Sequence, residues 1–269
     1  MQIVTMSSKW GVQLEGDTFN LTNLASKINH SIKSPASFFF AMINNVHVLR
    51  TQRWGGAATA IDAFQLAVGD INLIRGCLDA IDGCHAIEPG TVYRFKADGR
   101  YDMSRQTHLL SIFAHKRMED WASPDEFSEL LAKAESDRRL RAAFSDLTPD
   151  TPWIDIYRSW ESLKDFHGGE HKMHRAFKAE QKRIKQLTRT ANSFRHAKAY
   201  NVVPDPMPRE EAIIYLKDLL LRTAVVRGVP PVSQAFEPGQ QVQLTNYEPD
   251  PGQPASLNKL SLGRPINNI

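Results

Sequence analysis

Alternating apolar and polar positions in the first third of the chain predict strands. The segment Trp10–Gly16 alternates in this way, as a half-buried strand does, and Val46–Arg50 is rich in β-forming residues. Thr91–Lys96 alternates again and runs into Asp98-Gly99, a dipeptide typical of tight hairpin turns. We therefore expect three strands in this part of the chain.

A helical period separates the second and third of these strands. Between Thr59 and Ile81, apolar residues recur at steps of three and four, which places on one helix face Ile61, Phe64, Val68, Ile71 and Ile74. Gly83 follows as a stop signal. Strands and a helix together indicate a small mixed α/β domain over residues 1–118.

From Ser123 onward the pattern is helical. The run Ser123-Pro124-Asp125-Glu126 is a capping box with proline at the first helical position. The sequence predicts four helices, over about 124–144, 152–167, 170–199 and 209–227. Short turns separate them, at Gly168-Gly169 and in the proline-rich segment 203–208, and this favours a helical bundle.

The chain is therefore expected to be an α+β protein in three segments. A mixed α/β domain, 1–118, precedes a helical bundle, 119–228. Residues 229–269 are rich in Pro, Gly, Asn and Gln and show no helical period. Because such a composition buries little apolar surface, we expect a disordered C-terminal tail.

Composition changes this picture in one place. Hydrophobic residues make up 42% of the chain and charged residues 23%, as in ordinary globular proteins, and the formal net charge is +3. The segment 172–198, however, holds nine Lys or Arg residues and a single acid, Glu180, so the rest of the chain is net negative. Local asymmetry of this kind indicates a polyanionic partner.

The number of cysteines and the hydropathy of the chain indicate the cellular compartment. Cys77 and Cys84 are the two cysteines, and their number and spacing match neither a disulfide framework nor a common metal motif. The first residues lack the features of a signal peptide, and no stretch approaches the roughly 18 apolar residues of a bilayer span. We expect a protein of the reducing cytoplasm with no membrane partner.

The third expected helix carries two stripes. At 100° per residue, its polar stripe consists of Lys178, Lys182, Lys185, Arg189, Asn192 and His196. Its apolar stripe, roughly 150° away, consists of Phe177, Ile184, Leu187, Ala191 and Phe194. The apolar side should pack into the bundle, and the polar side should face outward.

This polar stripe has the residues that RNA binding and cleavage require. A row of lysines follows a phosphate backbone through Coulomb attraction and counterion release. His196 is able to transfer a proton near neutral pH, and Arg189 or Arg195 would stabilise the extra negative charge of the transition state. Since RNA supplies its own 2′-hydroxyl nucleophile, such a site needs no metal or cofactor.

The stretch Leu187–Ala197, followed by Pro206-Met207-Pro208 and an apolar helix, resembles the C-terminal regions of a group of bacterial proteins that are similar to the HEPN superfamily. The resemblance covers residues 151–228. The HEPN signature is an arginine, four to six residues, and a histidine; Arg189 and His196 satisfy it. Asn192 stands three residues after Arg189, whereas in active members an Asn often follows the Arg closely.

The resemblance implies a dimeric helical bundle that cleaves RNA without a metal, as a toxin or phage-defence effector. Two facing basic helices would form a positively charged cleft, with His196 as the proton-transfer residue. Arg189 or Arg195 would stabilise charge, and Asn192 would orient the phosphate or the base. An inhibitor or antitoxin partner would accompany such a protein.

Other interpretations of these residues stay open. The basic helix would equally serve a non-catalytic module that binds nucleic acid or an acidic protein, or dimerises, and it would also suit a structural protein with a solvated charged face. A histidine-rich cluster would suit zinc, although its spacing matches no established motif; it consists of His167, Glu170, His171 and His174. Three aromatic residues of the second helix are expected in the bundle core, namely Trp153, Tyr157 and Trp160.

Overall fold

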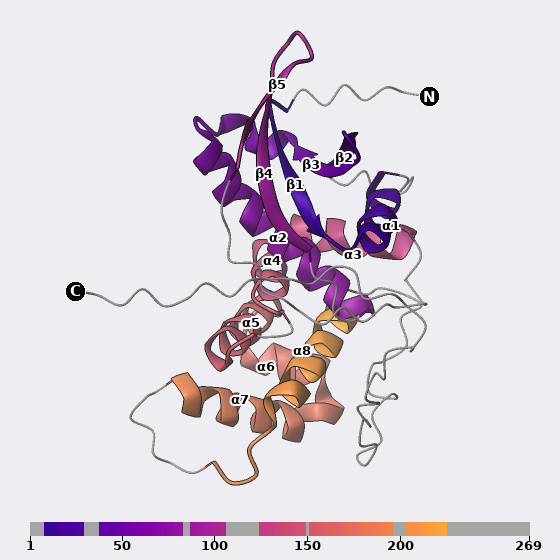
Figure 1. Ribbon diagram of the computed structural model, residues 1–269. Coiled ribbons are helices and arrows are strands. Elements are labelled where there is room, and N and C mark those ends of the chain that lie inside the picture. Colours follow the sequence, from indigo (N-terminus) through magenta and orange to yellow (C-terminus); the bar gives the residue numbers. More distant parts are fainter. Residues whose placement is uncertain are drawn as a thin grey trace, which may run out of the picture. The chain divides into compact units, whose positions relative to one another are not determined.

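The fold is mixed α+β, with an antiparallel five-stranded sheet and its helices followed by a helical region (Figure 1). We obtained it as a computed structural model of the full chain. The residues that the structure describes are 8–29, 38–82, 87–105, 124–148, 151–195 and 203–224. The expected domain boundaries at 118 and 228 and the expected tail, 229–269, lie outside these residues.

The sheet has the strand order β2-β3-β1-β4-β5, and every neighbouring pair is antiparallel. The strands are β1 (Trp10–Gly16), β2 (Phe38–Ile43), β3 (Val46–Thr51), β4 (Ile87–Phe95) and β5 (Tyr101–Ser104). The turn between β2 and β3 has positive φ angles at Asn44 (47°) and Asn45 (64°), as a type I′ hairpin turn requires. Gly99 supplies a φ of 83° in the turn between β4 and β5.

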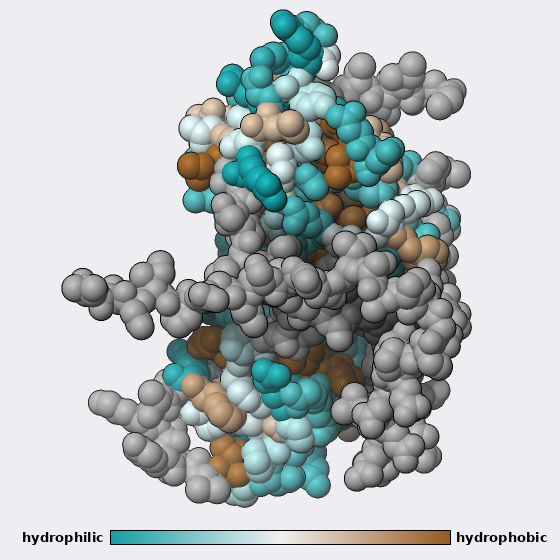
Figure 2. Space-filling model, viewed as in Figure 1, coloured by the Kyte–Doolittle hydropathy of each residue, from teal (hydrophilic) through white to brown (hydrophobic). Residues whose placement is uncertain are grey.

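The three predicted strands are confirmed as β1, β3 and β4, and the predicted turn at Asp98-Gly99 joins β4 to β5. The sequence reasoning missed β2, β5 and the helix α1 (Thr18–Asn29). In β2 the run of apolar residues hides the alternation that marks a half-buried strand. The tip of the β4–β5 hairpin is hydrophilic (Figure 2), and ion pairs there join Lys96 to Asp102 and Arg100 to Asp98.

The predicted helix after β3 is confirmed as α2 (Ala60–Asp82), which follows a short 3₁₀ turn, η1 (Gln52–Gly56). It packs against β4 and β1 and also against helices of the helical region. Of its predicted apolar stripe, Ile71 and Ile74 are fully buried, whereas Ile61, in the first turn of the helix, is 59% exposed. Burial of α2 against both the sheet and the helices places it at the centre of the core.

Two of the predicted helices are interrupted. The first is divided into α3 (Pro124–Ser136) and α4 (Arg138–Ser145), because Asp137 adopts an extended conformation and its side chain caps α4 by accepting from the Arg139 N–H. The helices α5 (Trp153–Phe166) and α8 (Arg209–Ala224) are confirmed. The helix α5 ends at Phe166, just before Gly168 and Gly169, whose positive φ angles (79° and 107°) are not helical, so the predicted stop is confirmed.

The expected single basic helix, 170–199, is wrong. It consists of α6 (Glu170–Ala176), a 3₁₀ turn η2 (Lys178–Glu180) and α7 (Gln181–Arg195). The break lies at Phe177, whose φ of −115° and ψ of 47° are not helical. Its ring packs against His167 (ring centroids 5.4 Å apart) and beneath the Arg222 guanidinium (5.1 Å), so tertiary contacts hold the chain out of the helix here.

Buried side chains of the sheet, α2 and the helical region form one continuous cluster. Polar contacts reinforce it on both sides of α2. Lys217 of α8 forms an ion pair with Asp79, which is 5% exposed. Asp70 accepts from the Trp54 indole N–H at 2.8 Å and also pairs with Arg141 of α4. These contacts attach the helical region to the helix that supports the sheet.

Candidate polyanion-binding face

The basic residues of η2 and α7 form an exposed row. We call it the basic face; it consists of Lys178, Lys182, Lys185 and Arg189, and all four side chains are exposed. None of them forms an ion pair with another of the described residues. Neighbouring cations behave differently, since Arg183 pairs with Glu211 at 2.9 Å and Arg222 pairs with Glu180. The positive charge of the basic face is therefore directed to solvent.

Burial of the opposite side fixes the orientation of α7. Ile184, Leu187 and Ala191 are at most 1% exposed, as the predicted apolar stripe requires. Thr190 adds a polar anchor, because its hydroxyl accepts from the Met207 N–H at 3.0 Å. The last member of the stripe does not follow the prediction: Phe194 is 59% exposed and stacks face to face on Trp153, with ring centroids 5.0 Å apart.

The structure separates the residues predicted to be catalytic. Arg195 is held against α5, where it donates to the Tyr157 hydroxyl at 2.8 Å and lies 4.8 Å from the ring centroid. Arg189 belongs to the basic face, and six residues at about 100° each place the two arginines about 120° apart around α7. Asn192 is half-buried. His196 follows the last described residue of α7, so its predicted role lies outside the described residues.

The predicted aromatic core of α5 is confirmed in part. Trp160 is 2% exposed and lies in the core, as expected. Trp153 is half-buried and covers one face of Phe194. Tyr157 is also half-buried, and its hydroxyl accepts a hydrogen bond from Arg195. The N-terminal half of α5 thus supports the end of α7 instead of lying wholly in the core.

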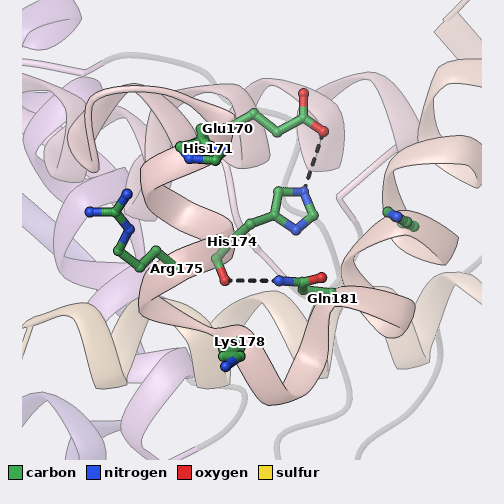
Figure 3. Close-up of a pocket in the computed structure, with 7 residues that line it drawn as sticks. Glu170, His171, His174, Arg175, Lys178 and Gln181 are labelled. Carbon is green, nitrogen blue, oxygen red and sulfur yellow. Dashed lines mark hydrogen bonds and ion pairs between the residues drawn. The ribbon is translucent and has the colours of Figure 1, made fainter.

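A pocket of about 730 Å³ lies beside the basic face, and Figure 3 shows the side chains around it. Its lining comes from α6, η2 and α7 and consists of Glu170, His171, His174, Arg175, Lys178, Gln181 and Lys185. Three of these residues are permanent cations and one is an acid, so the pocket is net positive even with neutral imidazoles. Lys178 and Lys185 belong to both the pocket and the basic face, which makes the two features continuous.

A histidine–carboxylate pair lies within this pocket. His174 Nε2 is 3.3 Å from Glu170 Oε1, one helical turn earlier, and the His174 side chain is 14% exposed. From the other side, Gln181 Nε2 donates to the His174 carbonyl oxygen at 3.4 Å. Figure 3 shows the His174 ring between Glu170 and Gln181, in the gap between α6 and the start of α7. Sequence reasoning grouped these histidines but missed Arg175 and Gln181 as their neighbours.

The four residues considered for zinc do not converge. The third histidine, His167, turns away from the pocket: its Nε2 lies 3.1 Å from the Thr223 hydroxyl, and its ring packs edge-on against Phe166 and Phe177. Burial lowers the pKa of His167, which favours the neutral ring in that apolar setting. Within the described part of the chain, no three His, Cys, Asp or Glu residues lie close enough to hold a metal ion.

Burial determines the chemical behaviour of the one described cysteine. Cys77 is fully buried in α2, and burial raises the pKa of its thiol well above the ordinary range. A thiol held protonated in this way packs as a small apolar group and does not act as a nucleophile. Cys84 lies outside the described residues.

Comparison of the chain with protein-family models, curated proteins and solved structures gives no match. The HEPN resemblance therefore stays a prediction from the residues that carry it. Among the helices that the structure describes, none combines the length and the apolar character that a bilayer crossing requires.

Proposed function

We propose that this protein binds RNA through the basic face. The observation that carries the proposal is the row of four exposed cations, Lys178, Lys182, Lys185 and Arg189, without an acidic partner among the described residues. An unpaired row of this kind repels itself unless a polyanion neutralises it, and binding releases the counterions of the phosphates.

The size of the row sets the expected salt dependence. Four contacts to a single-stranded phosphate backbone give a slope of about −3 for log affinity against log salt concentration. Raising the salt from about 50 mM to about 200 mM then weakens binding roughly 50-fold. A partner held by apolar contacts would show almost no such dependence.

Two charge-matched triple variants test the proposal. The first, Lys182→Gln/Lys185→Gln/Arg189→Gln, removes three charges from the basic face. The control, Lys96→Gln/Arg100→Gln/Arg158→Gln, removes three surface charges that already pair with acids. Kd values for a mixed RNA pool, measured by fluorescence anisotropy at several salt concentrations, give affinity and slope together.

The two variants should behave differently because only the first removes phosphate contacts. We expect it to lose at least about tenfold in affinity and to reduce the salt slope by about 2, whereas the control stays within about twofold of the wild type. Equal losses in both triple variants, or a wild-type protein that does not bind RNA, would reject the proposal.

RNA cleavage of the HEPN type is a second candidate, and it depends on the Arg189–His196 pattern and on the cationic setting of Arg189. The test is cleavage of an RNA pool in EDTA by wild-type protein and by His196→Ala. Cleavage that survives EDTA and disappears in this variant supports the candidate, and a folded His196→Ala that cleaves at the wild-type rate contradicts it. The accompanying homodimer is tested by light scattering after size exclusion.

A further inference from the structure

The pocket between α6 and α7 combines features that binding alone does not need. It contains two imidazoles, a carboxylate paired with one of them, and three cations, all around one volume of about 730 Å³. A volume of this size is within the range of small-molecule and nucleotide sites. Imidazoles beside cations suit proton transfer next to a bound phosphate.

We propose that this pocket cleaves RNA, with His174 as the base that removes the proton of a ribose 2′-hydroxyl. The inference rests on the proposed RNA binding, because the basic face would deliver the phosphate backbone to the pocket. It places the reaction on residues other than Arg189 and His196.

The contact with Glu170 decides which nitrogen of His174 acts. When the ring is neutral, one nitrogen carries a hydrogen and the other accepts one. The Glu170 carboxylate is an acceptor only, so Nε2 carries the hydrogen and donates across the 3.3 Å contact. The lone pair is then on Nδ1, and a carboxylate behind the ring stabilises the imidazolium that forms when Nδ1 takes a proton.

The cations of the pocket provide the phosphate site. Arg175, Lys178 and Lys185 line the volume from α6, η2 and α7 respectively. In the proposed site, charges from these three elements stabilise the additional negative charge of the five-coordinate transition state. Because this stabilisation comes from side chains, the proposed reaction proceeds without a metal ion.

His171 is the second described imidazole on the pocket lining, one helical turn before His174. In the proposed step, the 2′-oxygen forms a bond to phosphorus while its proton moves to Nδ1 of His174. The bond from phosphorus to the 5′-oxygen breaks, and that oxygen takes a proton from the protonated His171 ring. The products are a 2′,3′-cyclic phosphate and a free 5′-hydroxyl, so atoms and charges balance.

Glu170 is a positioning residue in this scheme, and its effect is visible in the cleavage rate at unchanged RNA Kd. The charged groups that line the pocket with His174 are Glu170 and Arg175 on its own helix, Lys178 on η2 and Lys185 on α7. Glu170→Gln removes the negative charge that stabilises the imidazolium formed when Nδ1 takes a proton. Glu170→Gln should therefore reduce the cleavage rate while RNA Kd stays within about threefold.

The test compares three single variants of the full chain, His174→Ala, His171→Ala and Glu170→Gln, with the Lys96→Gln/Arg100→Gln/Arg158→Gln control. The probe is an RNA pool in EDTA, with a DNA pool of the same length as the substrate that lacks the 2′-hydroxyl. Cleavage rate, product ends and RNA Kd are measured side by side, and circular dichroism confirms folding. His174→Gln replaces His174→Ala if the latter does not fold.

We expect the wild type to cleave RNA and not DNA, leaving 2′,3′-cyclic phosphate ends. The two pocket histidine variants should lose at least about 100-fold in rate with RNA Kd within about threefold, while the Lys96→Gln/Arg100→Gln/Arg158→Gln control keeps its activity. The inference fails if the wild type binds RNA without cleaving it, or if His174→Ala and His174→Gln cleave at the wild-type rate. Absence of RNA binding would instead reject the proposed function itself.

Discussion

The contact between α2 and α4 offers a sharp test of the fold. At Gly76 the two helices approach so closely that a Cβ atom would lie 1.8 Å from the Phe144 carbonyl oxygen and 2.6 Å from its carbon. Both atoms belong to the backbone, so no side chain is able to rotate away. The substitution Gly76→Ala introduces this Cβ and nothing else.

Two opposing effects set the change that Gly76→Ala makes in the free energy of unfolding. Non-bonded contact needs about 3.5 Å, so α2 and α4 would have to separate by roughly 1.5 Å or more, in a region where Cys77 and Phe144 are fully buried. Overpacking of this kind destabilises by about 3 kcal/mol at the upper end of its usual range, and the better helix propensity of alanine returns about 1 kcal/mol. We expect a net loss of about 2 kcal/mol in the free energy of unfolding.

A glycine in the same helix provides the matched control. Nothing lies within 4 Å of a Cβ added at Gly69, so Gly69→Ala gains propensity without a clash. This control should be more stable than the wild type by up to about 1 kcal/mol, which separates the two variants by about 3 kcal/mol. Urea unfolding followed by circular dichroism measures both. If Gly76→Ala proves as stable as Gly69→Ala, the close approach of α2 and α4 is wrong.

Two further predictions concern ion pairs. Lys217→Ala leaves the buried Asp79 carboxylate without its partner, which should lower the free energy of unfolding by about 3 kcal/mol or more in urea titrations at pH 7. Burial already raises the pKa of Asp79, so this loss should grow as the pH rises above the ordinary carboxyl range, and a loss independent of pH would contradict the prediction. At the start of α4, hydrogen bonds from Arg139 hold the pKa of Asp137 at about 2, so its stabilisation is complete above the ordinary carboxyl pKa and disappears as the pH falls through about 2. Asp137→Asn keeps the helix cap, and its stability deficit relative to the wild type should vanish in urea titrations as the pH approaches 2.

Local sequence patterns were enough to predict much of the fold. The alternation in β1 and β4, the helical periods of α2, α5 and α8, and the turns at Gly99 and Gly168 were readable because each depends on residues close together in the chain. The side chains of the basic face were also readable, since helical spacing alone places Lys182, Lys185 and Arg189 on one side of α7.

Elements that depend on contacts with residues far away in the chain could not be predicted from the sequence. The strand β2 is a continuous apolar run, and only its pairing with β3 makes it a strand. The break at Phe177 is invisible in the helical period, because it depends on the ring of His167 before it and on Arg222 of α8. A periodic pattern reports the face that a residue would occupy in a regular element, but not whether packing lets the element continue.

The candidate site, too, could be predicted from the sequence only in part. The sequence by itself determined that 172–198 carries a concentrated positive charge, and the spacing of Glu170 and His174 already allowed contact across one helical turn. Only the tertiary structure decided that α6 and α7 are separate, that His167 turns to Thr223, and that cations from three elements line one pocket with His174. The physical reason is that charge and period are properties of neighbours along the chain, whereas a pocket is made by residues that packing brings together.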